Sequence, residues 1–240
     1  FTSESEQKEM RLRIYSNVAY YYYMKSAFQA SVQLTEKAIS LAQELRDTLA
    51  WSDNLAQQSI SYQRLGNLEM AIRTTLDGLY LDSLLQDTLR LSSTYNNLAD
   101  LYLTAQRSED GKQYIDHAIE LEHSQAHPEK LSIRYGMAAE LYVKLGLLPE
   151  ALDFACKAYA LDMKSGDTLK IARRLSQMGD VYAAMQNLDE AEKVYRKSSE
   201  LLELLDERTS LAINYKQMGG LHIRKGNLLL AIRYLEKSAT

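Results

Sequence analysis

Three histidines in the middle of the sequence come closest to a metal-binding pattern. His123 and His127 are four residues apart, and His117 lies six residues before His123. Imidazole nitrogens bind zinc, and Glu120 or Glu122 could supply a third ligand for a metal-dependent hydrolase. A metal site also needs neighbours that orient its ligands, whereas this cluster lies at an expected helix end beside a junction. We therefore interpret the histidines as surface residues and expect neither a metal nor a cofactor.

The single cysteine, Cys156, is the one candidate for a thiol nucleophile. One cysteine excludes an intramolecular disulfide and a cysteine-based zinc site. Because Cys156 lies beside Ala155 and near Ala158 in an expected helix, we interpret it as a small buried core residue. The sequence contains no glycine-rich phosphate loop and no Ser-His-Asp arrangement on a plausible scaffold. We therefore expect a protein that is not an enzyme.

Composition and charge exclude several further classes of protein. The 240 residues carry a net charge of −4 without a basic patch, so we expect no direct nucleic-acid partner. No apolar run approaches the roughly 18 residues that span a bilayer, so we expect no membrane insertion. With only 2 prolines and 10 glycines, the chain favours long uninterrupted helices. The compartment is undetermined, with the cytoplasm favoured over the periplasm.

The sequence repeats every 40 residues, without gaps, over six units. Three columns of this repeat hold only alanine, glycine or serine, which allow two helix backbones to approach closely. The columns are Ala19, Ser59, Ala99, Ala139, Gly179 and Gly219; Ser31, Ala71, Gly111, Ala151, Ala191 and Ala231; and Ala38, Gly78, Ala118, Ala158, Ser198 and Ser238. A column of large residues reads Tyr22, Tyr62, Tyr102, Tyr142, Tyr182 and His222. These offsets fall on one stripe of an α-helix, so each unit is expected to be two amphipathic helices with that stripe in the core.

Turn and cap residues divide each unit into its helices. Gly66, Gly146 and Gly226 fall between the two helices, where a left-handed turn favours glycine. Aspartates recur between units, where they would cap the next helix. These N-caps are Asp47, Asp87 and Asp167, and the third junction has His127-Pro128 instead. The first helices are predicted over residues 11–25, 49–65, 89–105, 129–145, 169–185 and 209–225.

The fourth unit carries a recognisable family pattern, Tyr135-x-x-Ala138-Ala139-x-x-Tyr142 followed by Gly146-x-x-x-x-Ala151 and Ala158. This pattern resembles the tetratricopeptide repeat, and the long period is similar to the branch that includes kinesin light chains and bacterial peptide-pheromone receptors. The resemblance implies an all-α protein, a right-handed α/α superhelix of six helix pairs in one solenoid domain over residues 1–240. The implied repeats are 9–48, 49–88, 89–128, 129–168, 169–208 and 209–240. The third unit matches least well, with Gln106 and Arg107 at its turn.

A stripe opposite the core on the first helices is the candidate binding face. Five of its six central positions are carboxamides, which can donate and accept at once and so pair with the backbone of an extended peptide. Exposed apolar residues lie beside them, as in a groove for side chains. The predicted concave-face residues are Asn17, Tyr20, Gln57, Ile60, Asn97, Asp100, Ile133, Glu140, Arg173, Gln177, Asp180 and Gln217. In the tyrosine run at the end of the first helix, Tyr22 is expected in the core and Tyr23 at the groove or surface.

The predicted function is a non-catalytic scaffold that binds a protein or extended peptide segment. Two alternatives stay open: the polar stripe is an ordinary solvated face, or the stack self-associates without a peptide ligand. The chain opens on Phe1 rather than Met, and its sixth unit stops at Thr240 inside the second helix. We therefore expect a sensing or assembly portion of a larger bacterial regulatory protein.

Overall fold

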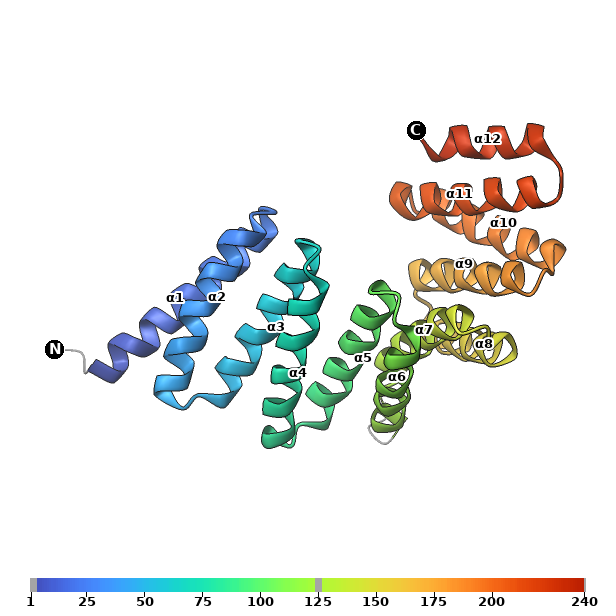
Figure 1. Ribbon diagram of the computed structural model, residues 1–240. Helices are drawn as coiled ribbons and strands as arrows, with labels where there is room; N and C mark the ends of the chain where they lie inside the picture. The colour runs from blue at the N-terminus through green and yellow to red at the C-terminus, as the bar shows by residue number, and fades with distance from the viewer. Residues whose placement is uncertain (1–3, 124–126, 240) are drawn as a thin grey trace. The chain divides into compact units, whose positions relative to one another are not determined.

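The computed structural model describes residues 4–123 and 127–239, and these residues form twelve helices that follow one another as antiparallel pairs (Figure 1). The helices are α1 Glu4–Met24, α2 Phe28–Leu45, α3 Thr48–Arg64, α4 Leu68–Leu85, α5 Thr88–Thr104, α6 Ser108–His123, α7 Pro128–Lys144, α8 Leu148–Ser165, α9 Thr168–Ala184, α10 Leu188–Leu204, α11 Arg208–Arg224 and α12 Leu228–Ser238. No strand occurs among the described residues. The predicted all-α class is confirmed.

The first helices begin one residue earlier than predicted, except for α1. That helix begins at Glu4 rather than at residue 11, with Glu4 and Glu6 in its first turn. Acidic side chains are favourable there because the helix dipole leaves positive charge at its N-terminus. Lys8 adds ion pairs to Glu4 at 3.2 Å and to Glu44 of α2 at 3.1 Å. These contacts account for the extra turns of α1.

The contacts divide the chain into two compact units, residues 1–125 and 126–240. The N-terminal unit contains α1 to α6 and the C-terminal unit contains α7 to α12. Within each unit, a second helix packs against both its own first helix and the first helix that follows. Each unit therefore buries its apolar faces between successive helix pairs, as a repeat of short helices requires.

The predicted small-residue columns lie in the core of both units. Every member of the three columns is buried except Ser238, which is half-buried. Ser59 shows the close approach directly, because its hydroxyl donates to the Ala71 carbonyl of the facing helix at 3.0 Å. At Gly179, an added Cβ would lie 2.5 Å from the ring of Tyr195. The small side chains thus make room for neighbouring backbone and rings.

The column of large residues is buried in the third, fourth and sixth pairs, at Tyr102, Tyr142 and His222. Tyr102 stacks on Tyr114 with ring centroids 5.4 Å apart, and Tyr142 meets Phe154 at 5.1 Å. The prediction that Tyr22 lies in the core is wrong, since 37% of this residue is exposed. The position that carries Tyr114 and Phe154 in the later pairs is a leucine in α2, so no facing ring covers Tyr22.

The predicted caps and turns occur where the repeat places them. Asp47 accepts from the backbone N–H of Ala50 at 2.9 Å, and Asp87 and Asp167 cap α5 and α9 in the same way. The turn glycines adopt left-handed φ angles of 76°, 74° and 77°. The same column also holds Ser26, Gln106 and Gln186 at positive φ, which the sequence did not indicate.

Gln106→Gly is expected to raise the free energy of unfolding of the N-terminal unit by about 0.5–1 kcal/mol. Gln106 has a φ of 58°, where a side chain is strained and glycine is not. The gain is limited because glycine also adds freedom to the unfolded chain. Urea unfolding followed by the fluorescence of Trp51, the single tryptophan, measures the change. A lower unfolding midpoint for Gln106→Gly would contradict this reading of the turn.

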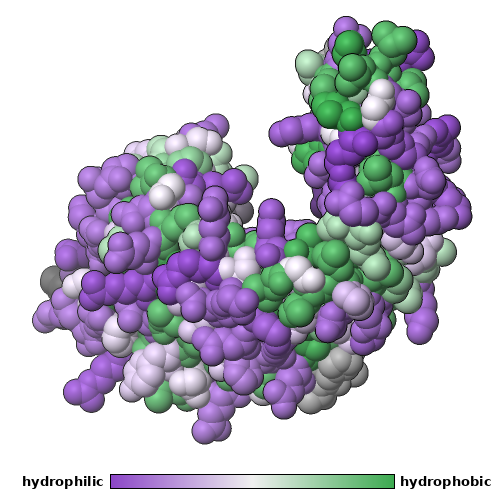
Figure 2. Space-filling view, turned by 45° about the vertical axis from the view of Figure 1, so that its right-hand side comes forward, coloured by the Kyte–Doolittle hydropathy of each residue, from purple (hydrophilic) through white to green (hydrophobic). Residues whose placement is uncertain are grey.

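Large apolar side chains are exposed on α12, at the upper end of the view in Figure 2. Leu228, Leu229 and Ile232 are 62%, 86% and 54% exposed. In the other five units the column of Leu229 is Gln, Glu, Glu, Pro and Asp, so an apolar residue at this position is particular to the last pair. Among the described residues, no helix is long and apolar enough to cross a membrane.

Candidate functional site

The first helices of a unit lie in register, so equivalent positions form rows across them. Gln63 of α3 donates from Nε2 to Asp100 of α5 at 2.9 Å. In the C-terminal unit, the Gln177 amide of α9 donates to the Glu140 carboxylate of α7. The partners in both pairs are 37 residues apart, close to one repeat. Both partners of the second pair are predicted residues, whereas Asp100 is the predicted member of the first pair.

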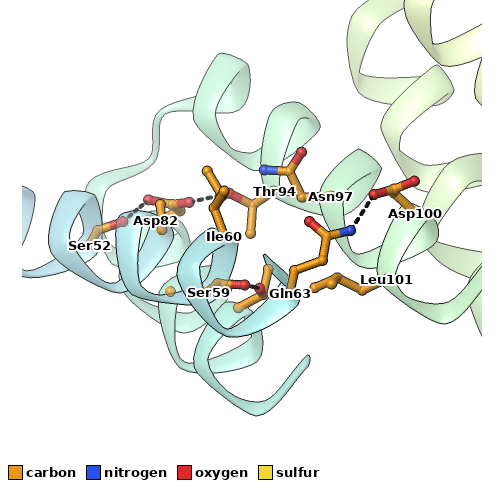
Figure 3. A pocket seen from close by; sticks show the side chains of 12 residues that line it. Ser52, Ser59, Ile60, Gln63, Asp82, Thr94, Asn97, Asp100 and Leu101 are labelled. Atoms are coloured by element: carbon orange, nitrogen blue, oxygen red, sulfur yellow. Dashed lines mark hydrogen bonds between the residues drawn. The ribbon is translucent and has the colours of Figure 1, made fainter. Parts of the chain in front are cut away.

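A pocket in the N-terminal unit lies between α3, α4 and α5 (Figure 3). Three predicted residues, Ile60, Asn97 and Asp100, line it. Asn97 is exposed and makes no hydrogen bond through its side chain in the described structure, so both ends of its amide are available. The amide of Gln63, which was not among the predicted residues, is held at the pocket edge by Asp100.

A groove in the C-terminal unit crosses α7, α9 and α11. It brings together five of the predicted residues: Ile133, Glu140, Arg173, Gln177 and Asp180. Ile213, an apolar residue of the same predicted stripe, also lines the groove, and Lys170 and Ser176 complete it from outside the prediction. Ser176 donates to the side-chain amide oxygen Oδ1 of Asn214 at 3.0 Å, which joins α9 to α11. The C-terminal unit therefore carries the most complete part of the predicted face.

The five carboxamides of the predicted binding face differ in whether their side chains are already hydrogen-bonded. Asn17, Asn97 and Gln217 are exposed without a side-chain hydrogen bond in the described structure. Gln57 is half-buried, and its Nε2 has no hydrogen-bond partner. Gln177 is occupied, because Arg174 donates to its Oε1 at 2.6 Å while its own amide donates to Glu140. The five carboxamides are therefore not equivalent, and three of them have side chains free to bind a ligand.

The remaining predicted residues lie at the edges of these sites. Tyr20 is exposed near the end of α1, and its neighbour Tyr23 packs on Phe28 with ring centroids 5.6 Å apart. Asn17 lines a depression between α1 and the start of α3, away from the pocket that contains Asn97. Gln217 faces solvent on α11.

Asp180 is the most perturbed acid of the predicted face. Burial, and to a smaller extent the neighbouring Glu140 carboxylate, raise the pKa of Asp180 to about 6. The Tyr195 hydroxyl donates to Asp180 at 2.6 Å and opposes that rise by stabilising the carboxylate. Burial in turn raises the pKa of Tyr195 well above its usual range. Asp180 therefore changes its charge between mildly acidic and neutral pH.

Two stretches of the sequence match family models of the tetratricopeptide repeat, residues 92–123 and residues 170–240. Over these two stretches the chain matches the tetratricopeptide repeat. No curated protein matches its sequence. The prediction from the tyrosine and small-residue columns is confirmed.

Solved structures of tetratricopeptide-repeat proteins share the fold at low identity. The apo form of RapI is 16% identical with a TM-score of 0.79, covering 99% of this chain and 84% of RapI. A putative kinesin light chain from Podospora anserina is 13% identical with a TM-score of 0.73, covering 86% and 100%. A Rap protein complexed with Competence and Sporulation Factor is 12% identical with a TM-score of 0.71, covering 98% and 77%.

Buried acids on the second helices are the feature that sequence reasoning missed. Asp82, Glu122 and Asp162 occupy one column, on the second helix of three successive pairs, and are almost fully buried. Asp82 accepts from Ser52 at 2.6 Å and from Thr94 at 2.7 Å (Figure 3). The signal was available, since each acid lies four residues after a member of the last small column.

Arginines of the following first helix pair with two of these acids. Arg90 donates from Nε to Asp82 at 3.0 Å, and Arg174 donates from Nε to Asp162 at 2.9 Å. Arg174 also holds Gln177, which holds Glu140. A continuous chain of hydrogen bonds therefore runs from the buried Asp162 to the groove of the C-terminal unit.

The other candidates for chemistry lie elsewhere. The prediction that Cys156 is buried is wrong, because its side chain is exposed on α8. Ala155 faces the core, and the next residue is turned by about 100° around the helix. Partial burial and then Asp153 raise the pKa of the Cys156 thiol. The ring of His117 lies 5.5 Å from that of Tyr95, and the side chain of His123 lies outside the described residues. The described part contains no group of three possible metal ligands.

Proposed function

We propose that the protein is a non-catalytic scaffold whose first helices bind extended segments of protein partners. The observation that carries this proposal is the combination of free carboxamides with exposed apolar side chains on the same face. Asn17, Asn97 and Gln217 offer unused hydrogen-bonding groups, and Ile60 lies beside Asn97 in one pocket. An amide can pair with the backbone of a peptide of any sequence, while apolar neighbours take up its side chains.

The relatives support a binding role at the level of the fold. One of the similar structures is a Rap protein in complex with Competence and Sporulation Factor, so this fold can present a binding surface. We further propose that the chain serves as the sensing or assembly part of a larger regulatory protein. Its acidic balance, with a net charge of −4, favours a protein ligand over direct contact with nucleic acid.

The double variant Asn17→Ala/Asn97→Ala is expected to weaken peptide binding about tenfold or more. Each alanine removes a side-chain hydrogen bond to the ligand, and one such bond contributes about 1 kcal/mol. An array of synthetic decapeptides identifies binders, and calorimetry of the full chain measures their affinity. Gln33→Ala, which removes an exposed carboxamide from the second helix α2, is the matched control.

Three outcomes separate the possibilities. A tenfold loss in the double variant with no change in Gln33→Ala supports the carboxamide mechanism. An unchanged affinity in the double variant removes that mechanism but leaves a peptide-binding face. Failure of every peptide in the array to bind contradicts the proposed function.

Self-association is a second candidate, favoured by the exposed apolar side chains on α12 (Figure 2). Leu228, Leu229 and Ile232 would bury apolar surface against another copy of the chain. Light scattering over a range of concentrations separates the two functions. A monomer at all concentrations excludes self-association and leaves the peptide-binding proposal in place.

A further inference from the structure

The face of the C-terminal unit changes its charge along the length of its first helices. Four rows cross α7, α9 and α11, because equivalent residues recur every 40 positions on helices that lie in register. From the N-terminal to the C-terminal ends of the helices, the rows are Lys130, Lys170 and Ser210; Ile133, Arg173 and Ile213; Met137, Gln177 and Gln217; and Glu140, Asp180 and Gly220. The face therefore runs from basic, through apolar and amide, to acidic.

The basic end of this face is available to a ligand. Arg173 is exposed, and the described structure shows no ion pair at its guanidinium. Lys170 lies in the first turn of α9, where its closest acid is Asp167 at 3.5 Å with both side chains about 40% exposed. The N-terminus of α9 adds its own partial positive charge. An acidic side chain of a ligand would be attracted to this end.

The acidic end keeps a negative balance, because the nearby Arg174 is occupied elsewhere and Lys144, whose charge lowers the pKa of Asp180, offsets only one of the two carboxylates. Arg174 pairs with the buried Asp162 at 2.9 Å and donates to Gln177. Glu140 is exposed beside Asp180, and its carboxylate disfavours the charged form of Asp180. A basic side chain placed here would relieve that repulsion.

Apolar side chains flank the basic end. Ile133 and Ile213 are 43% and 57% exposed and stand on either side of Arg173 in the same row. Both line the groove together with Arg173, Gln177 and Asp180. An aliphatic side chain of a ligand can therefore be buried next to its charged groups.

The corresponding rows of the N-terminal unit do not have this polarity. There Arg90 and Asp53 neutralise each other, with Nη1 2.7 Å from Oδ1. The row that is acidic in the C-terminal unit instead reads Tyr20, Ile60 and Asp100. The polarised face is therefore specific to the C-terminal unit rather than a property of the repeat.

We propose that the C-terminal unit binds an extended peptide segment with separated opposite charges. An acidic residue lies over Lys170 and Arg173, an aliphatic residue contacts Ile133 and Ile213, and a basic residue lies over Glu140 and Asp180. The proposal rests on the peptide-binding function and names the class of ligand for this groove. Arg173 and Asp180 are seven residues apart, and Lys170 and Asp180 ten, which is about 10–15 Å along a helix. An extended peptide covers that distance in about three to five residues.

The test is an array of capped decapeptides with an alanine–glutamine background and one isoleucine. Aspartate and lysine are placed at every pair of positions, in both orders, and matched peptides carry asparagine and glutamine there instead. Peptides with the charges three to five positions apart, in one of the two orders, are expected to bind the full chain at least tenfold more tightly than their neutral matches. Equal affinity for neutral and charged peptides overturns this inference while the peptide-binding function stands. Binding of no peptide overturns both.

A variant with exchanged charges tests the same face from the side of the protein. Arg173→Glu with Glu140→Lys places an opposite charge beside Lys170 at one end of the face and beside Asp180 at the other, so the difference in charge between the two ends is much reduced. The variant is expected to bind the charged peptides no better than the neutral ones. Arg233→Glu with Glu236→Lys makes the same charge changes on exposed positions of α12, outside the groove. Retention of the charge preference in the groove variant, or its loss in the α12 variant, contradicts the proposal.

Discussion

Asp82→Ala is expected to lower the free energy of unfolding of the N-terminal unit by about 3–5 kcal/mol, the usual cost of removing one partner from a buried ion pair. Asp82 is 2% exposed and accepts from the Ser52 and Thr94 hydroxyls as well as from Arg90. Alanine leaves both hydroxyls and the guanidinium without this acceptor, although Asp82 itself is almost fully buried. Urea unfolding followed by the fluorescence of Trp51, the residue next to Ser52, measures the loss.

Asp53→Ala is the matched control for this prediction, because Asp53 contacts the same arginine from the surface. Its carboxylate lies 2.7 Å from Arg90, but 57% of its side chain is exposed. Exposed ion pairs contribute about 0–1 kcal/mol, so Asp53→Ala is expected to change the unfolding midpoint only slightly. Equal effects of the two substitutions would contradict the assignment of the stabilising role to the buried acid.

The buried acids also connect the core to the candidate binding face. In the C-terminal unit, Asp162 orients Arg174, Arg174 holds the Gln177 carbonyl oxygen, and the Gln177 amide holds Glu140. These hydrogen bonds connect α8, α9 and α7. The side chains of Gln177 and Glu140 in the groove are therefore held in place through Arg174 by the buried Asp162. Fixing these side chains before binding reduces the conformational entropy that a ligand must overcome.

The helices were predictable because their signals are local and periodic. The small columns, the tyrosines and the N-cap aspartates repeat at a fixed interval, and each is dictated by the geometry of one helix or one turn. The left-handed conformation of Gln106 was not predictable, since glutamine gives no local sign of it. At this position the geometry of the repeat requires a left-handed turn, and Gln106 adopts it although this conformation is strained for a residue with a side chain.

Whether the side chain of a site residue is free or hydrogen-bonded depends in part on residues about one repeat away in the sequence. Asn97 and Gln177 occupy the same column, yet Asn97 is free and Gln177 is held from both sides. That difference arises because residues 174 and 140 are arginine and glutamate, whereas the equivalent residues 94 and 60 are threonine and isoleucine. Buried acids were missed for a similar reason, because a carboxylate is expected inside only when its partners are known.

Gly179→Val is expected to lower the free energy of unfolding of the C-terminal unit by about 3 kcal/mol. A Cβ at Gly179 would lie 2.5–2.8 Å from three atoms of the Tyr195 ring. The ring cannot move away freely, since Tyr195 is 2% exposed, donates through its hydroxyl to Asp180, and accepts from Asn214 at its backbone carbonyl. The added methyl groups must therefore displace Tyr195 and break its bond to Asp180.

Gly220→Val is the control that separates this steric effect from helix propensity. Both glycines lie inside first helices, but a Cβ at Gly220 meets nothing within 4 Å. Valine is slightly better than glycine in a helix, so Gly220→Val is expected to change stability by less than about 0.5 kcal/mol. Hydrogen–deuterium exchange of α9 and α10 locates the effect, with protection lost across both helices in Gly179→Val alone. Similar protection in the two variants would show that Tyr195 can repack, and that the small column tolerates larger side chains where helices cross.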